Sequence, residues 1–431
     1  MRRICCFFTL IVAVIIFLAA PGKAEEQKAG SKFEISFAER FRLETWDNAV
    51  SLEEGEADAR ANSRAKSTLT LQAFPNRSLE LNLSLTNENR YTFAPKSTAY
   101  NIHEVMVDNL FLKWDKIGGK PFTLTVGRQN MMLGEGFLIA DGGPLDGSRT
   151  FYFNAVRLDF ACKPMRLLTL FLVHQTEFDE WPVINDRDQK MVEQPETGLG
   201  LYFNGAYRRL SLEPYFIYKR IGTTSAAPVD SDIFTLGSRF TLTLSKPLKA
   251  RIEGAYQFGS RGERDRTAFG GYAYLDWKPG KPEKWPLEFS GGVIVLSGDD
   301  PATDAVESWD PLFSRWPKWS ESYIYTFSRE SRVAYWSNFV SLNGGLACNL
   351  KPNLRAAVTY HRLFAVERTP ASFFLSGEGY IRGDLVTSRF SYEVNKHFSG
   401  HFVWEFFSPG NFYLPTADSY SWLRFEFLFR T

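Results

Sequence analysis

Apolar and polar residues alternate with a period of two along most of this chain. Between 79 and 86, leucine occupies every second position and Glu, Asn, Ser and Thr occupy the others. The same alternation runs through 33–46, where Glu39 is the one exception, and through 422–429 near the end. A period of two is typical of a β-strand with one apolar and one polar face. These segments are therefore predicted to be strands.

Eighteen segments follow this pattern, with varying clarity. They are 33–46, 62–74, 79–90, 104–114, 121–129, 152–162, 165–175, 197–205, 208–220, 232–245, 249–259, 267–278, 286–297, 335–349, 353–364, 380–394, 398–408 and 422–429.

The connections between these segments alternate in length. Tight turns are expected at 75–77, 163–164, 246–247 and 350–352. The alternate connections are mostly long and polar, at 47–61, 91–103, 130–151, 176–196, 221–231, 260–266, 298–334, 365–379 and 409–419. This alternation through an even number of strands is typical of bacterial outer-membrane barrels. We predict an all-β, transmembrane, antiparallel up-and-down barrel of about 18 strands, with short periplasmic turns and long extracellular loops.

Two other fold classes fit less well. A soluble multi-sandwich protein also buries one face of each strand, but it has no reason to place its long loops at one end. A helical membrane protein needs apolar runs of about 20 residues. The only run of nearly that length lies at the N-terminus, from Ile4 to Ala20.

That N-terminal run is typical of a secretory signal peptide. Arg2 and Arg3 precede it, and Gly22 and Ala24 place small residues at the positions expected before a cut. We predict cleavage after Ala24, so that residues 1–24 are the signal and 25–431 form one barrel domain. The expected location is the outer membrane of a Gram-negative cell.

Composition and charge add little about partners or chemistry. Removing Arg2, Arg3 and Lys23 from the 50 basic residues leaves 47, against 49 acidic ones, so net charge identifies no partner. The usual motifs for serine hydrolases, phosphate-binding loops and zinc proteases are absent from the sequence. We therefore expect no enzyme activity, no cofactor, no metal site and no nucleic-acid partner.

Parity assigns each strand residue to the lipid or to the lumen. Apolar positions must face lipid, and the predicted lipid face includes Leu81, Leu83, Leu158, Leu236, Val358 and Phe425. Tryptophans near strand ends are candidates for an interfacial girdle, although any single one could instead be a core residue: Trp46, Trp114, Trp277, Trp285, Trp336, Trp404 and Trp422. The opposite parity assigns the following charged and titratable residues to the lumen: Arg40, Arg42, Glu44, Arg64, Lys66, Arg157, Asp159, Arg239, Arg251, Glu253, Arg355, His361, Arg389, Glu393, Arg424 and Glu426.

Basic residues outnumber acidic ones among these lumen positions, and two interpretations follow. An electropositive lumen favours an anionic solute, and we expect Arg42, Arg157 and Arg424 above all to pass it from site to site. Alternatively, the arginines pair with neighbouring carboxylates and only hold the wall together.

Several segments resemble the alginate export family of outer-membrane barrels, and the match spans most of the mature chain. The segments are 126–129, 143–150, 154–158, 314–319, 335–338 and 404–413. The resemblance implies a monomeric 18-stranded barrel whose arginine-rich lumen exports an acidic polysaccharide such as alginate. It also implies pore roles for Arg42, Arg128, Arg149, Arg157 and Arg424.

Some implications of the resemblance remain open. Strict alternation would point Arg128 at lipid unless a bulge or the strand end turns it inward. The alternatives to polysaccharide export are a general or anion-selective diffusion porin and a barrel-embedded hydrolase. Expected partners are outer-membrane lipid and lipopolysaccharide, the anionic polysaccharide or small anions, and periplasmic export components.

Overall fold

The computed structural model describes residues 32–53, 58–94, 102–140, 153–179, 181, 183–184, 191–280, 287–314, 319–323, 337–372 and 374–431. The predicted signal peptide (1–24) and Arg149 lie outside these residues. Among the residues described, no helix is both long and apolar enough to cross a bilayer.

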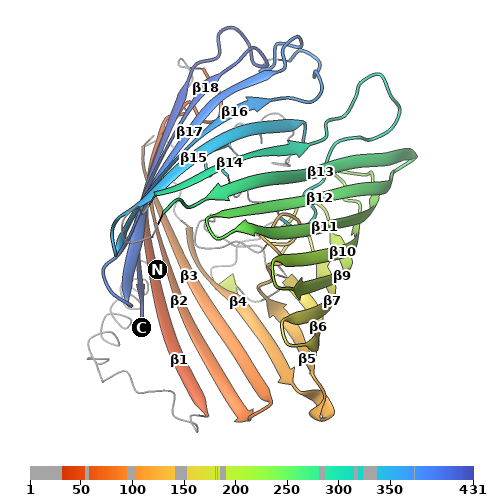
Figure 1. The fold of residues 1–431 in the computed structure, drawn as a ribbon, viewed down its shortest axis with the longest axis vertical. Coiled ribbons are helices and arrows are strands. Elements are labelled where there is room, and N and C mark those ends of the chain that lie inside the picture. The colour runs from red at the N-terminus through yellow and green to blue at the C-terminus, as the bar shows by residue number, and fades with distance from the viewer. Residues whose placement is uncertain are drawn as a thin grey trace.

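Antiparallel strands form the whole architecture (Figure 1). The strands are β1 (Phe33–Asp47), β2 (Arg60–Asn76), β3 (Leu79–Ala94), β4 (Ile102–Asp115), β5 (Phe122–Gln129), β6 (Phe153–Lys163), β7 (Arg166–Gln175), β8 (Val183–Ile184), β9 (Glu196–Ala206), β10 (Leu210–Ile221), β11 (Ser231–Ser245), β12 (Leu248–Arg261), β13 (Arg264–Trp277), β14 (Leu287–Leu296), β15 (Phe339–Lys351), β16 (Leu354–Phe364), β17 (Ile381–Glu393), β18 (Phe398–Pro409) and β19 (Tyr420–Arg430). A single turn of 3-10 helix, η2 (Ile117–Gly119), connects β4 and β5.

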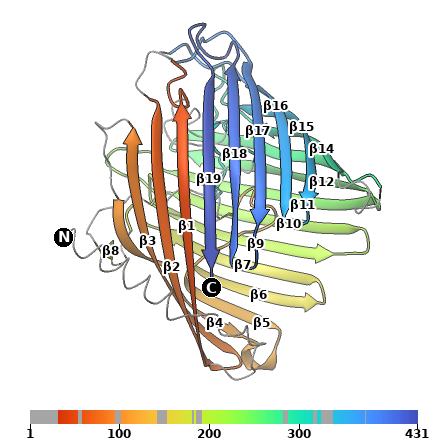
Figure 2. The ribbon, with the colours of Figure 1, turned by 90° about the vertical axis from the view of Figure 1, so that its left-hand side faces the viewer.

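The sheet closes into a barrel because its last strand pairs with its first. β19 runs antiparallel to β1, from Ala38 opposite Arg430 to Asp47 opposite Ser421 (Figure 2). The two-residue β8 pairs with β4 at Val105 and Met106, and β7 pairs directly with β9, so β8 is not one of the strands that close the wall. The wall therefore has 18 strands, which confirms the predicted fold class. Because the sheet closes on itself, each of these strands has a paired neighbour on both sides, as a membrane-spanning sheet requires.

The strand boundaries match the alternation in the sequence, but the length of one connection was predicted wrongly. We expected a long loop at 260–266, but β12 and β13 stay paired as far as Arg261 and Arg264. Only Gly262 and Glu263 form the turn, and Gly262 has a φ of 58°, which glycine adopts readily. The sequence pattern failed here because the strands continue as a polar hairpin beyond the region where apolar residues alternate.

The two faces of the wall follow the predicted parity. Leu81, Leu236, Val358 and Phe425 point outward and are 42%, 60%, 46% and 44% exposed. Charged residues of the opposite parity, such as Arg42 and Glu44, are buried inside the barrel. The outer face is accordingly rich in apolar side chains, as contact with lipid demands.

The tryptophan candidates for the girdle divide between the surface and the core. Trp114 and Trp277 are exposed near strand ends, whereas Trp46 and Trp422 are buried and lie opposite one another on β1 and β19. Trp46 shares the parity of Glu44, so it must point inward with the charged residues. Trp285 and Trp336 lie outside the described residues.

Connections from the long-loop end fold into the barrel and form an apolar core there. Met131, Leu138 and Ile139 from the β5–β6 connection join one buried cluster with Leu312 and Phe313 from the β14–β15 connection. The two connections are hydrogen-bonded, since the Phe313 amide donates to the Leu138 carbonyl at 3.0 Å. Our expectation of polar loops is wrong for these segments. Because they pack against the inner wall, apolar side chains are stabilised there as in any core.

Candidate functional site: the barrel interior

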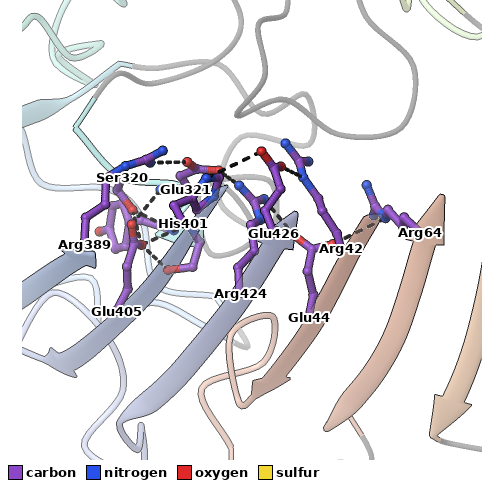
Figure 3. A network of polar contacts seen from close by, with 12 residues as sticks. Arg42, Glu44, Arg64, Ser320, Glu321, Arg389, His401, Glu405, Arg424 and Glu426 are labelled. Carbon is purple, nitrogen blue, oxygen red and sulfur yellow. Dashed lines mark hydrogen bonds and ion pairs between the residues drawn. The ribbon is translucent and has the colours of Figure 1, made fainter. Parts of the chain in front are cut away.

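Two pairs of opposite charges face each other across the closing strands. The β1–β19 register places Arg42 directly opposite Glu426 and Glu44 directly opposite Arg424. Arg42 forms an ion pair with Glu426, and Arg424 contacts Glu44 at 2.7 Å. Arg64 on β2 lies 3.4 Å from Glu44 and extends the row (Figure 3). Opposite charges on directly paired positions stabilise strand pairing, so this row reinforces barrel closure.

A short segment of the β14–β15 connection, Ser320–Tyr323, is held against this row. Arg424 forms an ion pair with Glu321 as well as with Glu44. Glu405 on β18 accepts hydrogen bonds from the Ser320 hydroxyl at 2.7 Å and from the backbone amides of Glu321 and Ser322 at 2.9 and 3.0 Å. Figure 3 shows these contacts converging from β17, β18 and β19. We call residues 319–323 the inserted segment.

Glu321 is the ionisable group at the centre of the inserted segment. Arg424, Arg42 and Arg389 surround it, and Glu405 lies on its other side. Burial raises the pKa of the Glu321 carboxyl to about 7, against the opposing effect of Arg424 and Arg42. The charge of this carboxyl therefore changes near neutral pH.

A second group of charges anchors the β5–β6 connection. Glu135 lies between two wall arginines, at 2.7 Å from Arg239 and 2.8 Å from Arg251. Arg239 also pairs with Glu213, and Arg251 with Asp276. One loop carboxylate thus bridges β11 and β12, and it partly neutralises two of the predicted lumen arginines.

A buried lysine anchors the β14–β15 connection in the same way. The Lys219 ammonium on β10 is fully buried and donates to the Leu312 carbonyl at 2.8 Å. It lies 3.2 Å from Glu196 and 3.3 Å from Asp310. An unpaired charge at this depth would be costly, so the pairing holds residues 310–312 in place.

Arg128 points into the barrel, although strict alternation directs it at lipid. Gly127, just before it, has a φ of 123°, which breaks the alternation. The Arg128 side chain is 1% exposed and pairs with Asp179 at 2.7 Å. It also donates to the Val107 carbonyl and to Asn154. A local irregularity thus turns the side chain inward.

The remaining candidate arginines differ in how far they are available to a solute. Arg40 is buried, and Arg157 pairs with Asp159 at 2.8 Å on the same strand. Arg355 is 40% exposed and lies 2.6 Å from Glu288. Arg149 lies outside the described residues.

Arg42 and Arg424 lie inside the barrel, but their side chains are only 0% and 2% exposed. In this structure they hold strands and the inserted segment together. Their role in passing a solute remains a prediction.

Two cavities in the part of the chain that the structure describes adjoin these charged groups. The first, which we call the loop cavity, has a volume of about 470 Å³. Its lining combines Glu135, Phe137, Trp309 and Trp319 from the connections with wall residues of β12 to β17, namely Arg251, Tyr272, Tyr274, Ser290, Ile294, Leu296, Asn343, Ala357, Thr359, His361, Thr387 and Arg389.

The second cavity, which we call the turn cavity, has a volume of about 420 Å³ and opens near the β15–β16 turn at Pro352 and Asn353. Its charged lining residues are Arg355, Arg389, Arg430, Glu393 and Glu426. In the lining of each cavity, arginines outnumber carboxylates.

Sequence reasoning missed the residues that hold the connections inside the barrel. Glu405 lies in the segment 404–413, but the resemblance implies no role for it; Lys219 and Asp310 have no distinguishing motif, and the partners of all three are remote in sequence. One signal was present. The β5–β6 and β14–β15 connections contain apolar clusters, such as 131–133 and 311–313, which exposed loops rarely carry.

Comparisons with known proteins support a membrane channel. The model of a family described as "Alginate export" matches residues 31–426. Solved structures from Pseudomonas aeruginosa share the fold. OpdQ has a TM-score of 0.60 at 10% identity, covering 93% of this chain and 99% of its own. OpdL has a TM-score of 0.59 at 13% identity, covering 94% and 99%.

The outer membrane protein OprD, also from Pseudomonas aeruginosa, has a TM-score of 0.58 at 10% identity, covering 95% of this chain and 96% of its own. No curated protein matches this chain. At these identities the structural likeness bears on the fold alone.

Proposed function

We propose that this chain, which belongs to the alginate export family, passes an acidic polysaccharide outward through the interior of its barrel. The family and the porin-like fold make it an outer-membrane channel rather than an enzyme. The acidic polysaccharide, the outward direction and the pore role of the lumen arginines are the parts that we propose.

The observation that supports the proposal is the charge of the residues that line the loop cavity and the turn cavity. The lining of the loop cavity contains two arginines, Arg251 and Arg389, and one carboxylate, Glu135. The turn cavity adds Arg355 and Arg430. Guanidinium groups keep their charge at neutral pH and offer paired donors that match a carboxylate. The nearby carboxylates keep each site weak enough to release its ligand, which conduction requires.

A second candidate is selective diffusion of small anions. The two cavities have volumes of about 470 and 420 Å³, and spaces of this size favour short solutes over a continuous chain. Both candidates require an anion-selective interior, and they differ in the length of the solute that passes.

Planar-bilayer recordings in a salt gradient test the shared requirement. The reversal potential of the native barrel should indicate anion selectivity. The double variant Arg251→Gln, Arg389→Gln should be less anion-selective. A matched control combines Arg220→Gln with Arg362→Gln. Arg220 and Arg362 directly follow the inward-facing Lys219 and His361, so their side chains point outward. Each pairs with an aspartate, and neither lines either cavity. Cation selectivity of the native barrel would contradict both candidates.

A further inference from the structure

Arg389 lies at the junction of the two cavities. Among the described residues, it alone lines both the loop cavity and the turn cavity. Its side chain is 35% exposed, in contrast to the fully buried Arg42 and Arg424. Its guanidinium is therefore within reach of a solute in either cavity.

The inserted segment already presents a carboxylate to Arg389. The Glu321 carboxylate lies 3.7 Å from the Arg389 guanidinium, beyond hydrogen-bond distance, while Glu321 also forms a closer ion pair with Arg424 (Figure 3). Arg389 otherwise donates a hydrogen bond to Ser391 at 3.2 Å. Of the two arginine contacts of Glu321, the one with Arg389 is therefore the weaker. When the Arg389 contact is lost, Glu321 remains paired with Arg424.

We infer that Arg389 is the site where a carboxylate of the solute is handed from one cavity to the other, and that Glu321 occupies this site in the absence of solute. The inference rests on the proposed function and adds a route and a specificity-determining residue. The solute class is an acidic saccharide. Its carboxylate replaces Glu321 on Arg389, and its sugar ring packs against the aromatic side of the loop cavity.

The lining of the loop cavity fits this class of solute. Trp319 and Phe137 supply aromatic faces from the inserted connections, and Tyr274 supplies one from the wall. Thr359 and Asn343 lie among them and offer hydrogen bonds to hydroxyl groups. Pockets that combine apolar walls with a few polar groups bind and orient small ligands in this way. Exit is favoured because Glu321 returns to Arg389 when the solute leaves.

Blockade of single-channel current by short saccharides tests the inference. The probes are a trisaccharide of uronic acid and a neutral trisaccharide of the same length. Arg389→Gln should weaken the blockade by the acidic probe about tenfold, because a charge-assisted hydrogen bond is lost, and leave the neutral probe unchanged. Arg362→Gln is the matched control, since Arg362 is also 35% exposed, lies on the adjacent strand and pairs with Asp384. All variants are first checked for heat-modifiable migration on gels.

A second variant keeps the test decisive if Arg389→Gln fails to fold. Glu321→Gln removes the competing carboxylate and should tighten the blockade by the acidic probe. Equal blockade of native, Arg389→Gln and Glu321→Gln channels by the acidic probe would overturn the handover site while leaving the proposed function intact. Equal blockade of the native channel by acidic and neutral probes would overturn the proposed function itself.

Discussion

The replacement Glu405→Ala should release the inserted segment from the wall. The Glu405 carboxylate is 2% exposed and accepts hydrogen bonds from two backbone amides and from the hydroxyls of Ser320 and Ser322. A hydrogen bond to a charged group contributes about 1.5–3 kcal/mol. The two amide bonds alone therefore represent about 3 kcal/mol at the lower end, which is more than about a hundredfold in the opening equilibrium of the segment.

Hydrogen exchange read by mass spectrometry over residues 319–323 measures this opening. The Tyr323 amide is the best reporter because its acceptor, the Ser320 hydroxyl, is retained in the variant. The control is Glu80→Ala, which removes a carboxylate that pairs with Lys113. Faster exchange in Glu405→Ala and native exchange in Glu80→Ala are expected. Unchanged protection of Tyr323 in Glu405→Ala would refute the idea that Glu405 holds the segment.

Two further predictions concern the lipid face and the pH response. Leu236→Arg should lower the free energy of unfolding in lipid vesicles by about 2–4 kcal/mol, and Leu236→Ala by much less, because position 236 faces the bilayer; an equal, small cost for both would mean that the parity is inverted. Lowering the pH from about 8 to about 6 protonates Glu321, whose pKa is raised to about 7, and removes a negative charge that faces three arginines. Anion selectivity should therefore increase over this range in the native channel but not in Glu321→Gln, and a flat native response would contradict the assignment.

The wall could be predicted from sequence because lipid imposes a rule on every strand. Residues 79–86 already show the alternation that the structure confirms in β3, and the apolar parity gave the outward direction of Leu236 and Phe425. The same rule places Trp46 and Trp422 inside, so these two girdle candidates are core residues. The position of a residue in the alternation thus predicted the direction of its side chain better than its residue type did.

The contents of the lumen could not be predicted in the same way. Arg128 depends on the single irregular backbone angle of Gly127. The contact between Glu405 and the inserted segment joins positions more than eighty residues apart. No periodic rule governs a loop that folds back into its own barrel, because packing there depends on shape and on individual charge partners. The sequence therefore indicates which residues face inward, but not which of them remain available to a solute.

Flux into proteoliposomes tests the central claim most directly, namely that the interior passes acidic saccharides in preference to neutral ones. Vesicles containing the purified barrel are exposed to labelled uronic-acid oligosaccharides and to neutral oligosaccharides of matched length, and the initial rate of entry is recorded for each. The arginine excess in both cavities predicts faster entry of the acidic oligosaccharides, with the difference reduced at high salt because screening weakens their attraction. Equal entry of the two, or faster entry of the neutral oligosaccharides, would contradict the account.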